Sequence, residues 1–235
     1  MAQGQLLYDG KTKLIFTAEK PEQVIIEFKD NESIFDGDKK ARFKDKAVLK
    51  NALNAAIFEY LNGYNIPTHF NKKLDEKRVL VKKLDMIPLK IIVRNIAAGT
   101  LCDRFQIEEG LPLKYPVIEY YLKSKKLGNL FISESHAYAF NYATPEEMKH
   151  IARLASKVNA VLKSYLERRK IKLIDYQLEF GRYQKLVLLG DEITPDTSRL
   201  WDIEAENKIN KKRFNFTNSK AQAAYQELYN RLLNK

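Results

Sequence analysis

Two stretches of different hydrophobic patterning meet at Asp85-Met86-Ile87-Pro88, where we predict a bend in the backbone. Residues 6–83 carry short β-branched and aromatic runs that predict strands. A proline lacks a backbone donor and biases the residue before it away from helix, so this segment separates two units. The strand Leu89–Arg94 opens the second unit. We therefore predict a strand-rich lobe over residues 1–86 and a second lobe over residues 87–235.

Three stretches have apolar residues at helical spacing. Ala47–Leu61 is followed by Asn62-Gly63, where glycine can take the left-handed conformation that closes a helix. Thr144-Pro145-Glu146-Glu147 combines a capping hydroxyl, a proline and an acid, which predicts a helix from there to about Arg169. Ala221–Leu233 predicts a closing C-terminal helix. Helices and strands in this arrangement indicate the α+β class, with a cleft between two lobes.

Strand patterns continue through the second lobe. Val117–Leu122 predicts a strand, and a glycine-containing loop follows it at residues 125–130. Leu173–Phe180 and Lys185–Leu189 predict a hairpin with its turn at Gly181.

The chain carries an excess of positive charge. Its 41 Lys and Arg residues against 30 Asp and Glu give a formal net charge of +11. This charge raises the alternative of a nucleic-acid-binding module, because Lys and Arg attract nucleic acid through counterion release. The basic residues, however, are spread from Lys11 to Lys235 among acids, and no RNA-recognition, zinc-finger or leucine-zipper pattern appears. A solvated basic surface, or the binding of small anions, explains the charge better.

No segment of the sequence indicates a membrane or an oxidising compartment. No apolar run approaches the roughly 20 residues that cross a bilayer, and Met1–Gly10 lacks the order of a secretion signal. Cys102 is the only cysteine and cannot form an internal disulfide. We expect a cytoplasmic protein that binds neither membrane nor nucleic acid.

Acidic residues are concentrated near the ends of the predicted hairpin strands. Alternation places Asp175, Gln177 and Glu179 on one face, and Ile174, Tyr176, Leu178 and Phe180 on the other. Asp191 follows the second strand. Two carboxylates at neighbouring strand ends repel unless they are separated, protonated or bridged by a cation, and Mg²⁺ favours carboxylate and phosphate oxygens. Glu179 and Asp191 are therefore candidate metal ligands, with an ordinary half-exposed strand as the alternative.

The segment Gly190–Asp202 continues from this hairpin and is rich in turn-forming and hydrogen-bonding residues. Arg199 can hold a phosphate or a carboxylate through two parallel hydrogen bonds. The alternative is a solvated turn in which Arg199 pairs with Asp196 or Asp202.

The turn Tyr8–Lys13 is a weak phosphate-binding candidate. Gly10 allows close backbone approach, and Lys11 and Lys13 can neutralise phosphate charge. The turn is neither a Walker A loop nor a GxGxxG fingerprint. The order of features along the chain is also that of protein kinases: a glycine-lysine turn, a bend at Met86, and then Asp175, Glu179 and Asp191. These are common residue types, so the order can also arise by coincidence.

Three kinds of residue are assigned to packing rather than to chemistry. His69, His136 and His150 lack metal-ligand spacing, so surface or packing roles are expected. Cys102 has no histidine near it in the sequence, which argues against a nucleophile. Trp201 is expected to anchor the loop by packing.

Several segments in fixed order resemble the SAICAR synthetases of purine biosynthesis, over nearly the full length. These segments are Leu7–Lys13, Leu80–Leu84, Val93–Thr100, Leu178–Gly181 and Gly190–Asp202. The resemblance implies a two-lobed α+β fold with an antiparallel-sheet N-terminal lobe, a mixed α/β C-terminal lobe and ATP in the cleft. It also implies ATP-dependent condensation of carboxyaminoimidazole ribonucleotide (CAIR) with L-aspartate through an acyl phosphate, and a homodimer.

The resemblance further implies roles for individual residues. Gly10, Lys11, Thr12, Lys13 and Lys123 would contact the phosphates of ATP, and Val81, Lys82, Leu84 and Met86 would line the adenine pocket. Glu179 and Asp191 would hold nucleotide-bound Mg²⁺. Arg94, Thr100 and Arg199 would hold the ribonucleotide, with Asp175 and Asp196 positioning them or the ribose. Asp36 and Gln177 are further implied substrate-binding residues. Lys13, Asp175, Glu179 and Asp191 form the implied catalytic set.

The chain departs from the family pattern at several of these positions. Gln177 and Asn129 stand where the family commonly has lysine and aspartate, so each replaces a charge with a neutral group. Thr100 and Thr194 replace serines and keep the hydroxyl. Lys211-Lys212-Arg213-Phe214 is more basic than the family's stretch there. These departures bear on the number of metal ions and on the grip on the second substrate. A small-molecule kinase with the same ATP geometry is the alternative enzyme.

Overall fold

The computed structural model describes residues 4–30, 33–36, 39–42, 45–124, 126–204, 214, 216 and 220–233. Two short strands, β4 (Ser33–Asp36) and β5 (Lys39–Arg42), form a separate antiparallel hairpin of which only the backbone is described. Asp36 lies in β4, and its side chain is outside the described part of the structure.

The first sheet is antiparallel and five-stranded, in the order β1-β2-β3-β7-β6. Its strands are β1 (Leu6–Asp9), β2 (Lys13–Thr17), β3 (Gln23–Phe28), β6 (Phe70–Lys73) and β7 (Arg78–Lys82). This sheet confirms the strand-rich character predicted for the N-terminal part of the chain.

The second sheet has six strands, in the order β10-β9-β8-β11-β12, with β13 paired to β11. Its strands are β8 (Asp85–Ile96), β9 (Pro112–Ser124), β10 (Gly128–Ile132), β11 (Ile171–Tyr183), β12 (Leu186–Gly190) and β13 (Ser198–Asp202). The glycine-containing loop expected at residues 125–130 is thus in part the strand β10. A one-turn 3₁₀ helix, η1 (Pro195–Thr197), leads into β13.

The bend expected at residues 85–88 is a bulge inside β8. Lys90 pairs with Glu179, and Met86 pairs with Gly181. Between these two pairs the chain advances by four residues in β8 but by only two in β11. Pairing with β9 begins only at Leu89. Pro88 therefore lies where no ladder hydrogen bond is required of its nitrogen, which is why a proline is tolerated in this central strand.

The hairpin turn predicted at Gly181 was wrong: Gly181 is inside β11, opposite Leu188, and the chain turns at Gln184-Lys185. A Cβ at Gly181 would lie 2.7 Å from the Leu84 Cβ and 3.0 Å from the Asp85 carbonyl oxygen. The glycine is required by this close crossing of the chain rather than by a turn.

The helices are α1 (Lys46–Gly63), α2 (Thr100–Phe105), α3 (Glu134–Ala139), α4 (Pro145–Glu167) and α5 (Ala221–Leu233). The predicted start of α4 is confirmed, because Thr144 accepts from the Glu147 N–H and Glu147 bonds back to the Thr144 N–H. Gly63 is the last residue of α1 but does not take the left-handed conformation; Asn65 does, at φ 54°. The two six-residue helices were not predicted.

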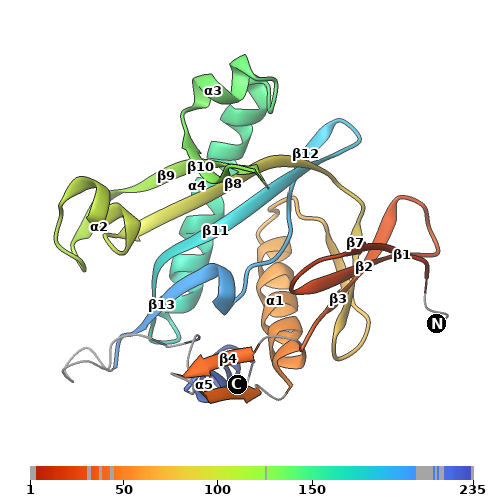
Figure 1. Cartoon of the computed structure of the whole chain (residues 1–235), viewed down its shortest axis with the longest axis horizontal. Helices are drawn as coiled ribbons and strands as arrows, with labels where there is room; N and C mark the ends of the chain where they lie inside the picture. Colours follow the sequence, from red (N-terminus) through yellow and green to blue (C-terminus); the bar gives the residue numbers. More distant parts are fainter. Residues whose placement is uncertain are drawn as a thin grey trace.

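One continuous apolar core contains residues of both sheets. Figure 1 shows how the sheets and helices are arranged. The helix α1 packs on β3, β6 and β7 of the first sheet and on α4 and α5. The helix α4 covers one face of the second sheet through β8, β9, β11 and β12. The face of the second sheet opposite α4 carries the polar residues of β8 and β11 that line a cavity.

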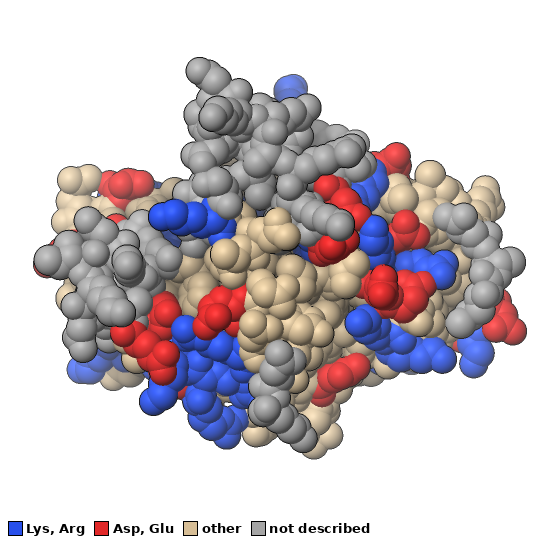
Figure 2. All heavy atoms as spheres, turned by 90° about the horizontal axis from the view of Figure 1, so that it is seen from below, with Lys and Arg blue, Asp and Glu red and all other residues tan. Residues whose placement is uncertain are grey.

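None of the described helices is both long and apolar enough to cross a bilayer. On the face of the molecule shown in Figure 2, Lys and Arg side chains are interspersed with Asp and Glu. This mixture agrees with the interpretation of the net charge as a solvated basic surface.

Candidate active site

Polar side chains line the face of the second sheet that α4 does not cover. Backbone pairing sets three pairs of residues opposite each other on β8 and β11: Arg94 and Asp175, Ile92 and Gln177, and Lys90 and Glu179. Directly opposite residues share a face, so these side chains lie together. Tyr176, Leu178 and Phe180 enter the main core, as alternation predicts.

Ile174 departs from the predicted alternation. It packs with Ile96, Ala98 and Trp201 in a small separate cluster rather than in the main core. The pairing of β11 with β13 shifts between Leu173 and Asp175, and such a bulge breaks the two-residue period. Trp201 is buried in this cluster, which confirms its predicted packing role.

Glu179 and Asp191 form an acidic pair at the end of the hairpin, because Glu179 pairs with Gly190, the residue before Asp191. Lys13 of β2 bonds the Asp191 carboxylate, and Lys123 of β9 bonds the Glu179 carboxylate. Two strands from different sheets thus bring lysines to the pair. The sequence predicted all four residues for this side of the site, and the structure brings them together.

The two carboxylates of the acidic pair differ in proton affinity. Burial raises the pKa of Glu179, and the nearby charge of Asp191 raises it further, against the opposing effect of Lys123. Burial also acts to raise the pKa of Asp191, but the bonded Lys13 ammonium lowers it on balance. Asp191 has a left-handed backbone, with φ 57°, which is uncommon for a non-glycine residue and concentrates at functional sites.

His69 is buried beside Asp191, a position that the sequence did not indicate. Burial lowers the pKa of His69 to about 4, so the ring is neutral at physiological pH. Its Nε2 has no hydrogen-bond partner within the described part of the chain. The described residues contain no group of three or more His, Cys, Asp or Glu side chains that could hold a metal ion. The His69 ring packs against Phe58, with ring centroids 5.3 Å apart, in line with its predicted packing role.

The turn between β1 and β2 carries the predicted phosphate-binding residues Gly10, Lys11 and Thr12. The Gly10 N–H donates to the Lys13 carbonyl oxygen at 2.9 Å and closes the turn. Lys29 secures it by donating to the Gly10 carbonyl oxygen at 2.8 Å, while the Lys29 backbone N–H donates to Thr12. Lys11 is exposed on this turn. The sequence did not indicate Lys29, because it follows β3 and reaches the turn only through the pairing of β3 with β2.

The predicted adenine-side residues fall into two groups. Val81 is buried in the core, and the Lys82 N–H donates to the His69 carbonyl oxygen at 2.7 Å. Leu84 and Met86 instead cross over Gly181 and Gly190, next to the acidic pair; a Cβ at Gly190 would lie 2.8 Å from Leu84 Cδ1. Of the four, Leu84 and Met86 have side chains placed to form a wall at the acidic pair.

A polar cavity of about 220 Å³ lies along the same sheet face, beyond the acidic pair. All the predicted substrate-binding residues except Asp36 line this cavity. They are Arg94, Thr100, Gln177, Asp196 and Arg199, and Asp175 lines it with them. Its volume is below the roughly 300–1,000 Å³ that is typical of ligand pockets.

Arginines dominate one end of this cavity. The buried Arg94 guanidinium donates to Glu119 at 2.7 Å, to Asp175 at 2.9 Å and to the Thr100 hydroxyl at 3.1 Å. Arg199 Nη1 lies 3.4 Å from the same Asp175 oxygen. Asp175 therefore orients Arg94 through a hydrogen bond, while Arg199 Nη1 faces it without a hydrogen-bond partner among the described residues. Burial raises the pKa of Asp175 although both arginines oppose that shift. Gly99, at φ 55°, leaves room for Arg199, whose Nη2 would lie 2.7 Å from a Cβ there.

Asp196 lines the cavity, but its carboxylate is already held by other groups. Lys46 and Lys50 of α1 each lie 3.1 Å from it, and the Tyr225 hydroxyl of α5 donates to it at 2.6 Å. Lys50 also lies 3.1 Å from Glu192. The only sequence signal for this buried network is a pair of lysines, four residues apart, on the core-facing side of α1.

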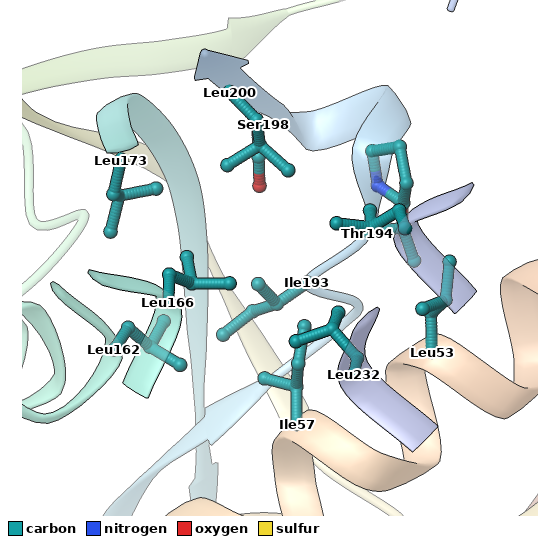
Figure 3. A pocket seen from close by; sticks show the side chains of 12 residues that line it. Leu53, Ile57, Leu162, Leu166, Leu173, Ile193, Thr194, Ser198, Leu200 and Leu232 are labelled. Atoms are coloured by element: carbon teal, nitrogen blue, oxygen red, sulfur yellow. The ribbon is translucent and has the colours of Figure 1, made fainter. Parts of the chain in front are cut away.

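The segment that carries Asp196 and Arg199 rests on apolar side chains. A small cavity of about 20 Å³ lies beneath it, lined by leucines and isoleucines of α1, α4 and α5 together with Ile193, Thr194 and Leu200 (Figure 3). This volume suits at most one water molecule, and its apolar lining makes it a packing gap.

The departures from the family pattern fall at distinct places in the site. Gln177 is half-buried and lines the polar cavity between Asp175 and Glu179. Asn129 lies in β10 opposite Lys123. Thr194 is buried below the segment of Asp196. Lys211-Lys212-Arg213 lies outside the described residues.

Two antiparallel sheets with one shared core, and a lysine-flanked acidic pair beside an arginine-lined cavity, define an α+β protein equipped to bind small anions. The sequence model of the family SAICAR synthetase matches residues 6–232. The chain therefore belongs to the SAICAR synthetase family, and the resemblance seen in its sequence is confirmed.

Individual relatives agree over nearly the whole chain. The phosphoribosylaminoimidazole-succinocarboxamide synthase of Desulfitobacterium hafniense (strain Y51) is 44% identical over 232 residues, which cover 99% of this chain and 98% of the relative. The corresponding synthase structure from Ehrlichia chaffeensis has a TM-score of 0.87 at 36% identity, covering 97% of this chain and 98% of that one. A SAICAR synthetase solved in complex with ADP has a TM-score of 0.88 at 37% identity, covering 98% of both chains. The predicted α+β class and two-lobed family fold are confirmed.

Proposed function

We propose that this chain, a ligase of purine biosynthesis, condenses CAIR with L-aspartate at the expense of ATP and releases SAICAR, ADP and phosphate. One observation carries the proposal: a lysine-flanked acidic pair and an arginine-lined cavity adjoin on one face of the second sheet. The lysines around the acidic pair suit nucleotide phosphates. The arginine-lined cavity suits a ribonucleotide that carries both a phosphate and a carboxylate. The solved relative with bound ADP supports the nucleotide part.

The reaction requires activation of a carboxylate, because a free carboxylate is a poor acylating agent. Phosphoryl transfer from ATP converts the CAIR carboxylate into an acyl phosphate, and attack by the aspartate amine then releases phosphate. Negative charge accumulates on the phosphoryl oxygens during the first step. Fixed cations around those oxygens stabilise the transition state more than the ground state.

Lys13 and Lys123 are the groups best placed to bind the nucleotide phosphates. Each bonds a carboxylate of the acidic pair, so each ammonium lies at the proposed site. Lys11, exposed on the β1–β2 turn, adds a further cation at the edge. We assign Leu84 and Met86 to the base of the nucleotide, with backbone contributions from Val81 and Lys82.

The acidic pair fits nucleotide-bound Mg²⁺. Glu179 and Asp191 supply two adjacent carboxylates, and Mg²⁺ in ATP sites uses one or two carboxylates plus phosphate oxygens. Lys13 and Lys123 would pass from the carboxylates to the phosphates when the ion binds with the nucleotide. The ion would supply charge neutralisation at the phosphates.

The ribonucleotide is assigned to the polar cavity. Asp175 accepts a hydrogen bond from Arg94 and lies 3.4 Å from Arg199 Nη1, and both guanidinium groups can bind the phosphate or the carboxylate of the ribonucleotide. Thr100 and Gln177 offer neutral hydrogen-bonding groups, while Asp196 shapes the cavity wall through its contacts with α1 and α5. The predicted contact from Asp36 stays a prediction.

A coupled assay tests the function. ADP, phosphate and SAICAR should appear together only when ATP, CAIR and L-aspartate are all present. ADP release that is unaffected by omitting aspartate would instead support a small-molecule kinase. Salt-sensitive RNA binding without turnover would support a nucleic-acid-binding module.

Three further features belong to the proposal. They are a cytoplasmic location, a homodimer, and a division into lobes at residues 86 and 87. This boundary falls inside β8, because the last strand of the first sheet ends at Lys82 and the first strand of the second sheet begins at Asp85. Light scattering after gel filtration tests the dimer, because a single species at twice the chain mass is expected.

A further inference from the structure

Lys90 is a half-buried lysine beside the acidic pair, and none of the roles described above uses it. It lies in β8 directly opposite Glu179 of β11, so the two side chains share the polar face of the sheet. Glu179 and Lys123 are the charged groups that act on it. The acidic pair is therefore surrounded by three ammonium groups, on Lys13, Lys90 and Lys123.

The three ammonium groups differ in what they contact. Lys13 bonds Asp191, and Lys123 bonds Glu179. Within the part of the chain that the structure describes, no carboxylate lies within ion-pair distance of the Lys90 ammonium. A partly desolvated cation without an ion-pair partner is costly in a protein, and at a site for anionic substrates it indicates a group held for a ligand.

The position of Lys90 in the sheet indicates which anion it meets. Across the strands, Gly190 of β12 pairs with Glu179 and Glu179 pairs with Lys90, so Lys90 is on the far side of Glu179 from Asp191 and Lys13. Along β8, Lys90 is two residues from Ile92, which lines the polar cavity. That spacing is about 7 Å. Lys90 thus lies between the proposed nucleotide phosphates and the proposed acceptor.

We propose that Lys90 binds the phosphoryl group during its transfer from ATP to the CAIR carboxylate. This inference rests on the proposed function. In the transfer a carboxylate oxygen forms a bond to the γ-phosphorus, while the bond from that phosphorus to the oxygen bridging to ADP breaks. The electron pair of the broken bond leaves on ADP, and no proton is transferred. The Lys90 ammonium offsets the charge on the three oxygens that move with the phosphorus.

The proposal separates γ-phosphate from β-phosphate recognition, which equilibrium binding can measure. Isothermal titration calorimetry with ADP, and with an ATP analogue carrying an imido group between the β- and γ-phosphorus atoms, should be run at one fixed Mg²⁺ concentration. Lys90→Met should weaken analogue binding by roughly tenfold or more, the loss of one charge-assisted hydrogen bond. ADP binding should stay within about twofold of wild type, which also shows that the variant is folded.

Two further variants complete the experiment. Lys90→Arg keeps the charge and should retain the preference for the analogue. Lys149→Met changes an exposed lysine of α4, on the opposite side of the sheet, and should leave both affinities unchanged. Equal weakening of ADP and analogue by Lys90→Met, or no weakening of either, overturns the role of Lys90. Failure of the wild-type chain to bind ADP overturns the proposed function itself, and this inference with it.

Discussion

At the scale of single residues, Asp191 combines an uncommon backbone conformation with a bonded carboxylate. Its backbone is left-handed, its carboxylate bonds Lys13, and it follows the residue paired with Glu179. Six other described non-glycine residues also have a positive φ, so it is the contact with Lys13 and the nearness of Glu179 that indicate a role for Asp191 in chemistry. Substitution of this side chain should therefore affect turnover more than folding.

Asp191→Asn should reduce kcat by about 10²-fold or more, because the amide keeps the shape but removes the charge that positions Lys13 and binds a cation. Circular dichroism should show an unchanged fold. Glu146→Gln, an exposed change on α4, is the control and should keep wild-type turnover. Near-normal kcat in Asp191→Asn contradicts the metal-binding role.

His69 gives the free energy of unfolding a defined dependence on pH. Burial lowers its pKa to about 4 in the folded chain, while the unfolded value is about 6.5. Between these values the unfolded chain binds the proton and the folded chain does not, so stability falls as pH falls from about 6.5 to 4. The shift corresponds to roughly 3 kcal/mol.

Urea denaturation of the ligand-free chain in metal-free buffer, at several pH values from 4 to 7, measures this effect. His69→Gln should flatten the dependence, whereas His136→Gln, on an exposed surface, should not. Identical pH profiles for wild type and His69→Gln would remove His69 as the cause.

At the scale of elements, the sequence predicted what local chemistry determines. The start of α4 was predicted because the capping hydroxyl, proline and glutamate lie within four consecutive residues. The turn at Gly181 was misplaced because this glycine is required by the close approach of Leu84 and Asp85, which are distant in sequence. Short helices such as α2 escape prediction because six residues carry too little periodicity.

The close crossing at Gly181 makes a prediction about the wall of the nucleotide site. Gly181→Ala places a Cβ 2.7 Å from the Leu84 Cβ and 3.0 Å from a carbonyl oxygen, so the crossing segment must move. Unfolding free energy should fall by about 1–3 kcal/mol, and the KM for ATP should rise as Leu84 shifts.

Gly63→Ala is the matched control for this change. Gly63 has open space around it and ends α1 without a left-handed backbone. Alanine there should leave KM unchanged and stabilise the chain slightly, by up to about 1 kcal/mol. Wild-type KM and stability in Gly181→Ala would contradict this prediction, because the segment of Leu84 and Asp85 would then move aside with no loss of unfolding free energy.

At the scale of the whole molecule, the C-terminal helix is tied to the cavity through buried charges. Tyr225 of α5 donates to Asp196, which Lys46 and Lys50 of α1 also hold. The sequence did not indicate this network, because a lysine on a helix has no local mark of the acid it meets. The candidate acids Glu179 and Asp191 were found because strand alternation and the strand ends indicate them, whereas no such local pattern indicates Lys50 or Lys90.

Tyr225→Phe tests this long-range connection. Removal of the hydroxyl leaves Asp196 with fewer partners and should lower the unfolding free energy by about 1–3 kcal/mol. The segment carrying Arg199 should loosen, so the KM for CAIR should rise while the KM for ATP is preserved. Tyr229→Phe, a half-buried change on the same helix, is the control. Equal effects of the two variants on the KM for CAIR would show that α5 acts on stability alone.

The bond between Lys13 and Asp191 joins a strand of the first sheet to the end of a hairpin in the second. Under the proposed function, nucleotide-bound Mg²⁺ and the Lys13 ammonium use the same Asp191 carboxylate, so binding would exchange one partner for the other. The free energy needed to break the bond between Lys13 and Asp191 would then offset part of what the nucleotide and its cation contribute. The connection between the two sheets would pass through the bound nucleotide.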